Sequence, residues 1–213
     1  HTPDHLSDAE AASLTCAGLT AWSAIVRHGQ AQSGDVILTQ GTGGVSLFAL
    51  QFAKILGARV AITSSSDAKL ERAKALGADH GINYSTNTEW GQAAKDWAGG
   101  DGIDNVIELG GTETMKQSLI AVRPGGTLSL IGVLSGATTG NVLLPFIISR
   151  DVRLQGVTVG PMDAMAQMCK AIEVSKMHPV IDKVFPLNKT IDAYQYVASG
   201  VHFGKVCISI DDA

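Results

Sequence analysis

A short glycine-rich loop is the feature of this sequence whose spacing best suits a chemical task. The apolar run Asp35–Thr39 leads into Gly41–Gly44 (GTGG), and an amphipathic stretch, Val45–Leu56, follows. Backbone amides in the first turn of a helix, together with the positive end of the helix dipole, form a site that suits a pyrophosphate. Gly41 permits the tight turn, and Gly43 lets phosphates approach the backbone because a Cβ atom would obstruct them.

The surrounding sequence matters, because a glycine turn between a strand and a helix is a weak signal alone. Ser46 stands where the G-x-G-x-x-G pattern has its third glycine, and its small side chain still permits close helix–strand packing. Short apolar runs and helical segments keep alternating after the loop, as in a dinucleotide-binding fold. We therefore predict that the loop binds a dinucleotide. The predicted contacts are five consecutive residues: Gly41, Thr42, Gly43, Gly44 and Val45.

The end of the second apolar run indicates which dinucleotide is bound. NAD sites usually carry an Asp or Glu about 20 residues beyond the glycines, where it binds the ribose hydroxyls. Here the run ends in a serine cluster followed by Lys69, and these groups would bind the 2′-phosphate of NADP(H), which a carboxylate would repel. NAD(H) remains the alternative, since Asp67 lies close by and Ser66 also fits a helix N-cap. The predicted contacts at this end are Ser64, Ser65, Ser66 and Lys69.

The alternation of apolar runs and helical segments predicts an α/β fold with a doubly wound, six-stranded parallel Rossmann sheet. Helical segments ending at Gly57 and Gly77 have a typical helix stop. The predicted strands are Asp35–Thr39, Arg59–Thr63, His80–Asn83, Ile103–Glu108, Thr127–Ile131 and Arg150–Gly156. The predicted helices between and after them are Val45–Leu56, Asp67–Leu76, Thr88–Ala98, Thr112–Ala121, Val142–Ser149 and Asp163–Ser175.

Two segments lie outside this pattern. Asp8–His28 predicts a long leading helix, with Ser7 as its N-cap and Glu10 completing a capping box. After residue 177 the pattern predicts a short strand–helix–strand tail, which is too small to be a stable domain and must pack on something larger. We therefore divide the chain into residues 1–177, the Rossmann domain with its leading helix, and residues 178–213. The elements of the tail are Val180–Phe185, Ile191–Ala198 and Lys205–Ile210.

The composition and charge of the chain exclude some classes of function. The chain has 213 residues, of which 45% are hydrophobic and 17% charged, and its net charge is −4 with both signs interspersed. No basic face predicts nucleic-acid binding, and the longest uninterrupted apolar runs are too short to span a bilayer. Three widely spaced cysteines without C-x-x-C spacing are typical of reduced thiols, so we expect a cytoplasmic protein with no secretory leader.

Other catalytic motifs are absent from the sequence. It contains no H-E-x-x-H, G-x-S-x-G or P-loop pattern and no Cys/His cluster with metal-ligand spacing. His178 and His202 precede apolar segments, which favours structural roles for both. Asp104 and Glu108 alternate along a predicted strand, and their spacing makes no case for acid–base chemistry. The sequence therefore assigns no catalytic residue and no metal site.

Several segments together resemble a known family. They are DAEAASLTCAGLTAW, VILTQGTGGVSLFALQFAK, LERAKALGADHGINY, VRPGGTLSLIGVLSG and HFGKVCISI. The chain resembles the medium-chain dehydrogenase/reductase superfamily, in particular its zinc-type alcohol dehydrogenase-like and quinone oxidoreductase-like members. The resemblance implies an NAD(P)-dependent oxidoreductase with a catalytic domain, a Rossmann domain and a short return to the catalytic domain. It also implies that residues 178–213 are the return segment and that the N-terminal catalytic domain is missing from this chain.

The resemblance also implies roles for single residues. Cys16 matches a catalytic zinc ligand of zinc-containing relatives, although one thiolate cannot form a three-ligand site, and a small buried thiol is the alternative. Thr20 matches a contact on the nicotinamide side, Tyr84 a contact near the adenosine, and Lys205 a basic residue that reaches the cofactor phosphates. The segments that would flank the nicotinamide are Gly132, Val133 and Leu134, together with Val159 and Gly160.

The resulting hypothesis is an NADP(H)-dependent oxidoreductase that acts on an alcohol/carbonyl pair, a quinone or another activated alkene. Without its catalytic domain the chain would be inactive, so a cofactor-binding module or an NADPH-sensing subunit with no turnover is the competing interpretation. We also expect a homodimer. Asp151–Val159 would form an apolar, proline-free sheet edge that can pair across a twofold axis, unless the Val142–Ser149 helix or the tail covers it.

Overall fold

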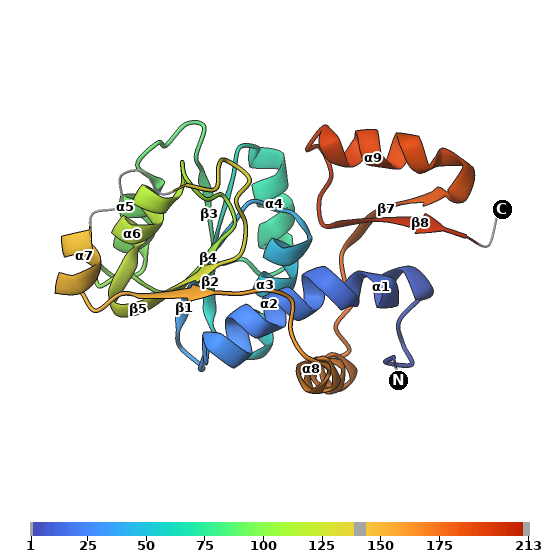
Figure 1. The fold of residues 1–213 in the computed structure, drawn as a ribbon, viewed down its shortest axis with the longest axis horizontal. Coiled ribbons are helices and arrows are strands. Elements are labelled where there is room, and N and C mark those ends of the chain that lie inside the picture. The colour runs from blue at the N-terminus through green and yellow to red at the C-terminus, as the bar shows by residue number, and fades with distance from the viewer. Residues whose placement is uncertain (1, 139–143, 211–213) are drawn as a thin grey trace.

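The computed structural model describes residues 2–138 and 144–210. Its centre is a six-stranded parallel sheet in the order β3-β2-β1-β4-β5-β6, the doubly wound arrangement expected from the sequence (Figure 1). This order places the carboxyl ends of β1 and β4 side by side at the switch point. The strands are β1 Val36–Gln40, β2 Arg59–Ser64, β3 His80–Asn83, β4 Ile103–Glu108, β5 Val122–Leu130 and β6 Arg153–Gly156.

Helices cover both faces of the sheet, and each face has its own apolar core. One core joins the leading helix, α3, α4 and α8 to the sheet and contains the stacked pair Phe48 and Phe52. The other core contains Trp90, Leu119 and Val106 and lies under α5 and α6. The helices are α3 Gly44–Ile55, α4 Asp67–Ala75, α5 Trp90–Trp97, α6 Met115–Ala121, α7 Leu144–Ser149 and α8 Met162–Ser175.

Many element boundaries differ from the sequence prediction by one to three residues, and the start of β5 differs by five. Strand β5 begins at Val122, five residues before the predicted Thr127, although Pro124 and two glycines interrupt it. Val122 pairs with Ile103, the register then shifts, and pairing resumes between Thr127 and Asn105, so a bulge absorbs residues that have the composition of a turn. Strand β6 is shorter than predicted, and the first two residues of the predicted Val142–Ser149 helix lie outside the described residues.

The leading helix is continuous but irregular. It consists of α1 Asp8–Ser13, a π-helical segment Leu14–Gly18, α2 Leu19–Trp22 and a second π-helical segment Ser23–His28. The predicted capping box of Ser7 and Glu10 is present. By length and composition Asp8–His28 could cross a membrane, contrary to the reading of the apolar runs above. However, 61% of its most apolar window is buried inside the protein, as in the core helix of a folded domain.

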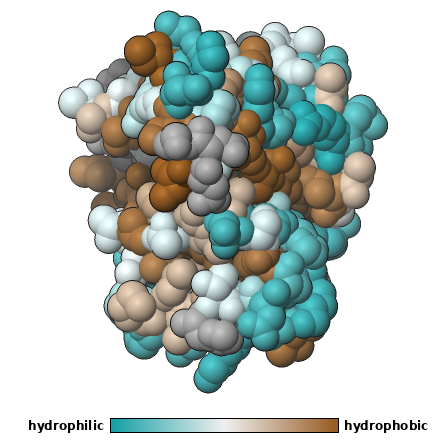
Figure 2. All heavy atoms as spheres, turned by 90° about the vertical axis from the view of Figure 1, so that its right-hand side faces the viewer, coloured by the Kyte–Doolittle hydropathy of each residue, from teal (hydrophilic) through white to brown (hydrophobic). Residues whose placement is uncertain are grey.

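The tail forms a separate two-stranded parallel sheet covered by one helix (Figure 1). Its elements are β7 Ile181–Pro186, a 3-10 turn Leu187–Lys189, α9 Thr190–Ala198 and β8 Lys205–Ser209. The tail packs on α1 and is tied to α4 by an ion pair between Arg72 and Asp182 (3.2 Å). Brown, hydrophobic patches lie on the side of the molecule that Figure 2 shows, the side of the tail. Ile191 (73% exposed) and Tyr194 (72%) of α9 are among the exposed side chains of the tail.

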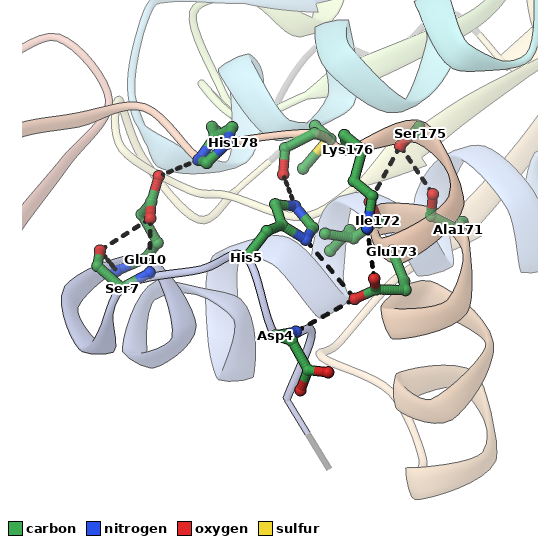
Figure 3. Close-up of polar contacts among 11 residues, drawn as sticks. Asp4, His5, Ser7, Glu10, Ala171, Ile172, Glu173, Ser175, Lys176 and His178 are labelled. Atoms are coloured by element: carbon green, nitrogen blue, oxygen red, sulfur yellow. Dashed lines mark hydrogen bonds and ion pairs between the residues drawn. The ribbon is translucent and has the colours of Figure 1, made fainter.

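Polar contacts fasten the N-terminal segment to the link between α8 and β7 (Figure 3). The His5 ring contacts the carbonyl of Met177 (3.1 Å) and lies 3.6 Å from the Glu173 carboxylate. His178 contacts Glu10 at 2.8 Å. These contacts give His178 the structural role that the sequence favoured, and they fix the start of the tail against the leading helix.

Candidate functional site

A cavity of about 370 Å³ opens where β1 and β2 end, directly above the glycine loop. The sheet order explains its position, because ligands of doubly wound sheets bind beyond the carboxyl ends of the strands. Its wall combines the Rossmann domain with the tail. The lining residues are Gln40, Gly41, Thr42, Gly43, Gly44, Val45, Ser46, Ser64, Ser65, Lys69, Tyr84, Leu109, Leu134, Gly200 and His202.

The glycine loop forms the floor of the cavity. Gly41 has φ +72°, the left-handed conformation that favours glycine, and therefore makes the turn out of β1. A Cβ atom at Gly43 would meet no atom within 4 Å, so the space beside this backbone is open toward the cavity. Helix α3 begins at Gly44 without a side-chain cap from Gly43. Uncapped amides at the start of a twelve-residue helix, beside open space, suit an anion.

Ser46 takes the place of the third glycine in the way that the sequence indicated. It is buried, and its hydroxyl donates a 2.6 Å hydrogen bond to the carbonyl of Gln40. This bond joins the first turn of α3 to the end of β1. The small Ser46 side chain therefore allows close packing and adds a hydrogen bond between α3 and β1.

The serine cluster at the end of β2 divides between two tasks. Ser64 is buried and lines the cavity, and Ser65 is exposed at its wall. Ser66 does not line the cavity; its hydroxyl accepts from the Lys69 amide (3.4 Å) and so caps α4, the alternative left open above. Asp67 accepts a hydrogen bond from Asn83 (2.7 Å) and is not among the lining residues.

Lys69 and Tyr84 stand at the mouth of the same end. The Lys69 ammonium donates a 2.6 Å hydrogen bond to the carbonyl of Gly200 in the tail. Partial burial lowers the pKa of Lys69, with Asp182 opposing the shift and Arg72 adding to it. Tyr84 is 43% exposed, directly after β3. This end of the cavity therefore carries one cation and two serine hydroxyls, with an exposed phenol at its rim.

The tail closes the cavity from the opposite side. The amide of Gly204 donates to the carbonyl of Thr42 (2.9 Å), which joins the tail to the glycine loop. Lys205 does not line the cavity but lies over the start of α3, because a Cβ atom at Gly44 would come within 2.5 Å of its Cδ. The tail also supplies two lining residues that sequence reasoning did not assign to the site, Gly200 and His202.

The other end of the cavity is less enclosed. Leu109 and Leu134 line it, and Leu134 is 89% exposed. Five residues predicted to contact the cofactor here are outside the lining: Thr20, Gly132, Val133, Val159 and Gly160. The Thr20 hydroxyl donates to the carbonyl of Cys16 (2.7 Å) within its own helix, and Gly160 lies against Ser23 and Leu19, where a Cβ atom would clash.

A buried polar network that sequence reasoning missed joins the end of β1 to the end of β4. Glu108 is 1% exposed, and its carboxylate accepts from the amides of Gly110 and Gly111 (both 2.9 Å). The amide side chain of Gln40 donates to Glu108 (2.8 Å) and accepts from the Leu109 backbone (3.0 Å). Thr114 and Ser118 donate to the same carboxylate. The detectable signal was a polar residue at the carboxyl end of each of two neighbouring strands.

The described residues do not assemble a metal site. No group of three or more His, Cys, Asp or Glu within residues 2–138 and 144–210 could hold a metal ion. Cys16 is exposed on the first π-helical segment, so the alternative of a buried thiol is wrong. We assign no zinc ligand to this part of the chain.

Comparison with known proteins identifies relatives of the whole chain. Residues 44–174 match the family described as zinc-binding dehydrogenase. A zinc-type alcohol dehydrogenase-like protein of Schizosaccharomyces pombe is 44% identical over 216 residues, covering 99% of this chain and 62% of the relative. The chain thus spans about 60% of the length of this relative.

Solved structures share the fold closely. An alcohol dehydrogenase structure from Sinorhizobium meliloti superimposes with a TM-score of 0.93 at 41% identity, covering 98% of this chain and 60% of that one. A structure named as an NAD-dependent alcohol dehydrogenase gives 0.91 at 31% identity, with coverages of 98% and 61%. A mycobacterial protein, Rv1454c, solved with NADPH, superimposes with a TM-score of 0.85 at 26% identity, covering 98% of this chain and 68% of that one. Both nicotinamide cofactors therefore occur among similar folds.

Proposed function

Because the chain belongs to the zinc-binding dehydrogenase family, we propose that it is the NADP(H)-binding part of an oxidoreductase. The complete protein would transfer hydride between the nicotinamide and an alcohol/carbonyl pair, a quinone or another activated alkene. The observation that carries the proposal is the cavity above the glycine loop, where open space meets the uncapped start of α3.

The residues present fit such a cofactor. Gly41 and Gly43 leave a cradle that any Cβ atom would fill, and the first turn of α3 would receive the pyrophosphate there. Lys205, above the same turn, would add a positive charge. Ser64, Ser65 and Lys69 would bind a 2′-phosphate through hydroxyls and an ammonium group. These contacts support NADP(H), and no carboxylate ends β2 where an NAD site would have one.

When bound, the nicotinamide supplies or accepts the hydride, and this chain's residues hold and orient the cofactor. The Gln40–Glu108 network fixes the backbone of residues 109–111 beside the open end of the cavity. The glycine loop and the serine cluster fix the opposite end. We assign no catalytic residue within this chain.

A second candidate is a cofactor-binding module with no turnover by itself, including an NADPH-sensing subunit. The exposure of Leu134 (89%) and Val133 (61%) favours it, because these side chains offer a substrate little enclosure at the nicotinamide end. Assays of the chain with NADPH and small carbonyl or quinone substrates test the module interpretation. We expect cofactor binding without turnover; measurable turnover would contradict the module interpretation.

The test of the cofactor assignment is calorimetric titration with NADPH and with NADH. We expect tighter binding of NADPH, and in Ser64→Asp a loss of about tenfold for NADPH only, because the new carboxylate repels the 2′-phosphate. Ser149→Asp, an exposed serine on α7, is the matched control and should change neither affinity. Equal or tighter binding of NADH by the unmutated chain would refute the NADP(H) preference.

We also propose that two copies pair through β6, which is an edge strand of the sheet. The Val157 amide donates to Leu130 inside the sheet (2.9 Å), so strand alternation directs the amides of Leu154 and Gly156 to the free edge. Leu154→Pro should therefore weaken a dimer by removing an edge donor. Sedimentation equilibrium measures the dissociation constant of the dimer. A parent chain that stays monomeric at high micromolar concentration would exclude this assembly.

A further inference from the structure

His202 is the histidine of the cavity wall, and its setting differs from that of the exposed His178. It comes from the tail, between Gly200, whose carbonyl is held by Lys69, and Gly204, whose amide is bound to Thr42. The next residue, Phe203, is 2% exposed and lies under the guanidinium of Arg72. These anchors on both sides fix the segment and hold His202 at the cavity.

The imidazole of His202 has an unused polar atom. Its Nδ1 is buried and has no hydrogen-bond partner among the residues that the structure describes. A buried imidazole nitrogen without a partner is unfavourable unless a ligand supplies one. His202 lines the same cavity as Ser64, Ser65 and Lys69.

We propose that His202 recognises the 2′-phosphate of NADP(H). When that phosphate binds, the imidazole takes up a proton and donates a charge-assisted hydrogen bond to it. This inference rests on the proposed function and adds a residue from the tail to its specificity. NADH lacks the 2′-phosphate and gives His202 no such partner. His202 is then a second specificity determinant, independent of the serine cluster.

The charges around His202 explain why protonation would await the ligand. Lys69 acts on it from α4, Lys205 from β8 and Asp182 from β7. Arg72 of α4 lies over the neighbouring Phe203 ring and pairs with Asp182. Burial lowers the pKa of His202, Lys69 and Lys205 lower it further, and Asp182 opposes them. The ring is therefore neutral at pH 7 in the absence of an anion. A phosphate dianion placed among these groups favours the charged imidazole.

The test compares the parent with His202→Asn, which keeps a polar group but cannot titrate. NADPH affinity at pH 7 should fall about tenfold in the variant, whereas NADH affinity should not change. Titration in two buffers of different ionisation enthalpy measures the protons taken up. Because the 2′-phosphate itself titrates with a pKa near 6, the informative quantity is the difference between parent and variant. We expect the parent to take up more protons than His202→Asn with NADPH, and an equal number with NADH.

His178→Asn is the matched control, since it removes an exposed histidine bound to Glu10 outside the cavity, and both affinities and proton uptake should stay at parent values. If His202→Asn fails to fold, imidazole NMR signals of the parent serve instead. One signal should report protonation on adding 2′,5′-ADP and not on adding ADP.

The outcomes separate this inference from the proposed function. A parent that binds neither NADPH nor NADH overturns the proposed function itself. A parent that prefers NADPH, together with a His202→Asn variant of unchanged affinity and proton uptake, overturns only the role of His202. Equal loss of NADPH and NADH would also overturn it, because His202 would then not distinguish the 2′-phosphate.

Discussion

The two ends of the cavity are built in different ways. The end near Ser64 and Lys69 is enclosed by two parts of the chain, the Rossmann domain and the tail, which touch at Gly200 and Gly204. At the end near Leu109 and Leu134 the backbone is fixed by the buried Glu108 network; Leu109 is half buried, whereas Leu134 is 89% exposed. Under the proposed function, this difference would give the chain the determinants of cofactor binding and few of the determinants of substrate choice.

The largest expected effect is at the glycine loop, on which both ends depend. Gly43→Val should weaken binding of NADPH and NADH by at least about a hundredfold, because the branched side chain fills the open space beside the backbone. Its melting temperature should stay near that of the parent, since the added Cβ atom meets nothing and φ is −80°.

Gly156→Val on β6 is the control, because its Cβ atom also meets nothing but lies outside the cavity. Calorimetry and thermal unfolding follow both variants. Normal NADPH binding by Gly43→Val would show that the phosphates lie elsewhere.

The second largest effect is expected at Glu108, and it should change binding at one end of the cavity and not at the other. Glu108→Gln should lower the free energy of unfolding by about 2 kcal/mol, because an amide NH₂ then faces donors that lose their acceptor. The backbone of residues 109–111 should shift, so NADPH affinity should fall several-fold, whereas 2′,5′-ADP, which lacks the nicotinamide, should bind as before.

Urea unfolding and calorimetry measure these quantities, with the exposed Glu113→Gln as the control. Equal losses for NADPH and 2′,5′-ADP would mean that the two ends of the cavity are not independent.

The smallest effect concerns the contact that holds the tail over the enclosed end. Burial would raise the pKa of Asp182, but hydrogen bonds from Tyr196, Arg72 and the Phe203 amide outweigh it, so the pKa lies below 3.8. The stabilisation by this carboxylate is therefore present above about pH 4 and is lost as the pH falls through the lowered value.

Asp182→Asn should remove about 1 kcal/mol at pH 7, since the partner Arg72 is half exposed and screened by solvent, and should flatten the acid side of the stability curve. Urea unfolding between pH 3 and 7 tests this. If the stability of the variant falls at low pH as steeply as that of the parent, Asp182 is not the cause of the acid destabilisation.

The fold could be predicted because its determinants are local. Apolar runs, helix-terminating glycines and the capping box of Ser7 and Glu10 each specify an element within a few residues. The departures have local physical causes as well: Pro124 and two glycines in β5 have the composition of a turn, but a bulge accommodates them in the strand.

The candidate site could be predicted only where its residues follow one another in the chain. The glycine loop directly follows β1, and Ser64 is the last residue of the neighbouring β2, so the sequence sufficed for them. The partnership of Gln40 with Glu108 depends on β1 lying beside β4, and the place of His202 depends on how the tail folds back. Gly160 has a positive φ and packs on the leading helix, a constraint that resembles a ligand contact in sequence.

The hydrogen bond between Gly204 and Thr42 has a consequence for the order of assembly during synthesis. The chain emerges from its N-terminus, and all six strands of the Rossmann sheet precede residue 157. The floor of the cavity is therefore available early, whereas its second wall, which includes Gly200 and Gly204, is synthesised later. Contacts between residues so distant in sequence also form late in folding, because a long loop must close first. A nascent chain that binds the proposed cofactor would thus retain it only once the tail has left the ribosome and docked, so cofactor retention would report that the tail has folded onto the Rossmann domain.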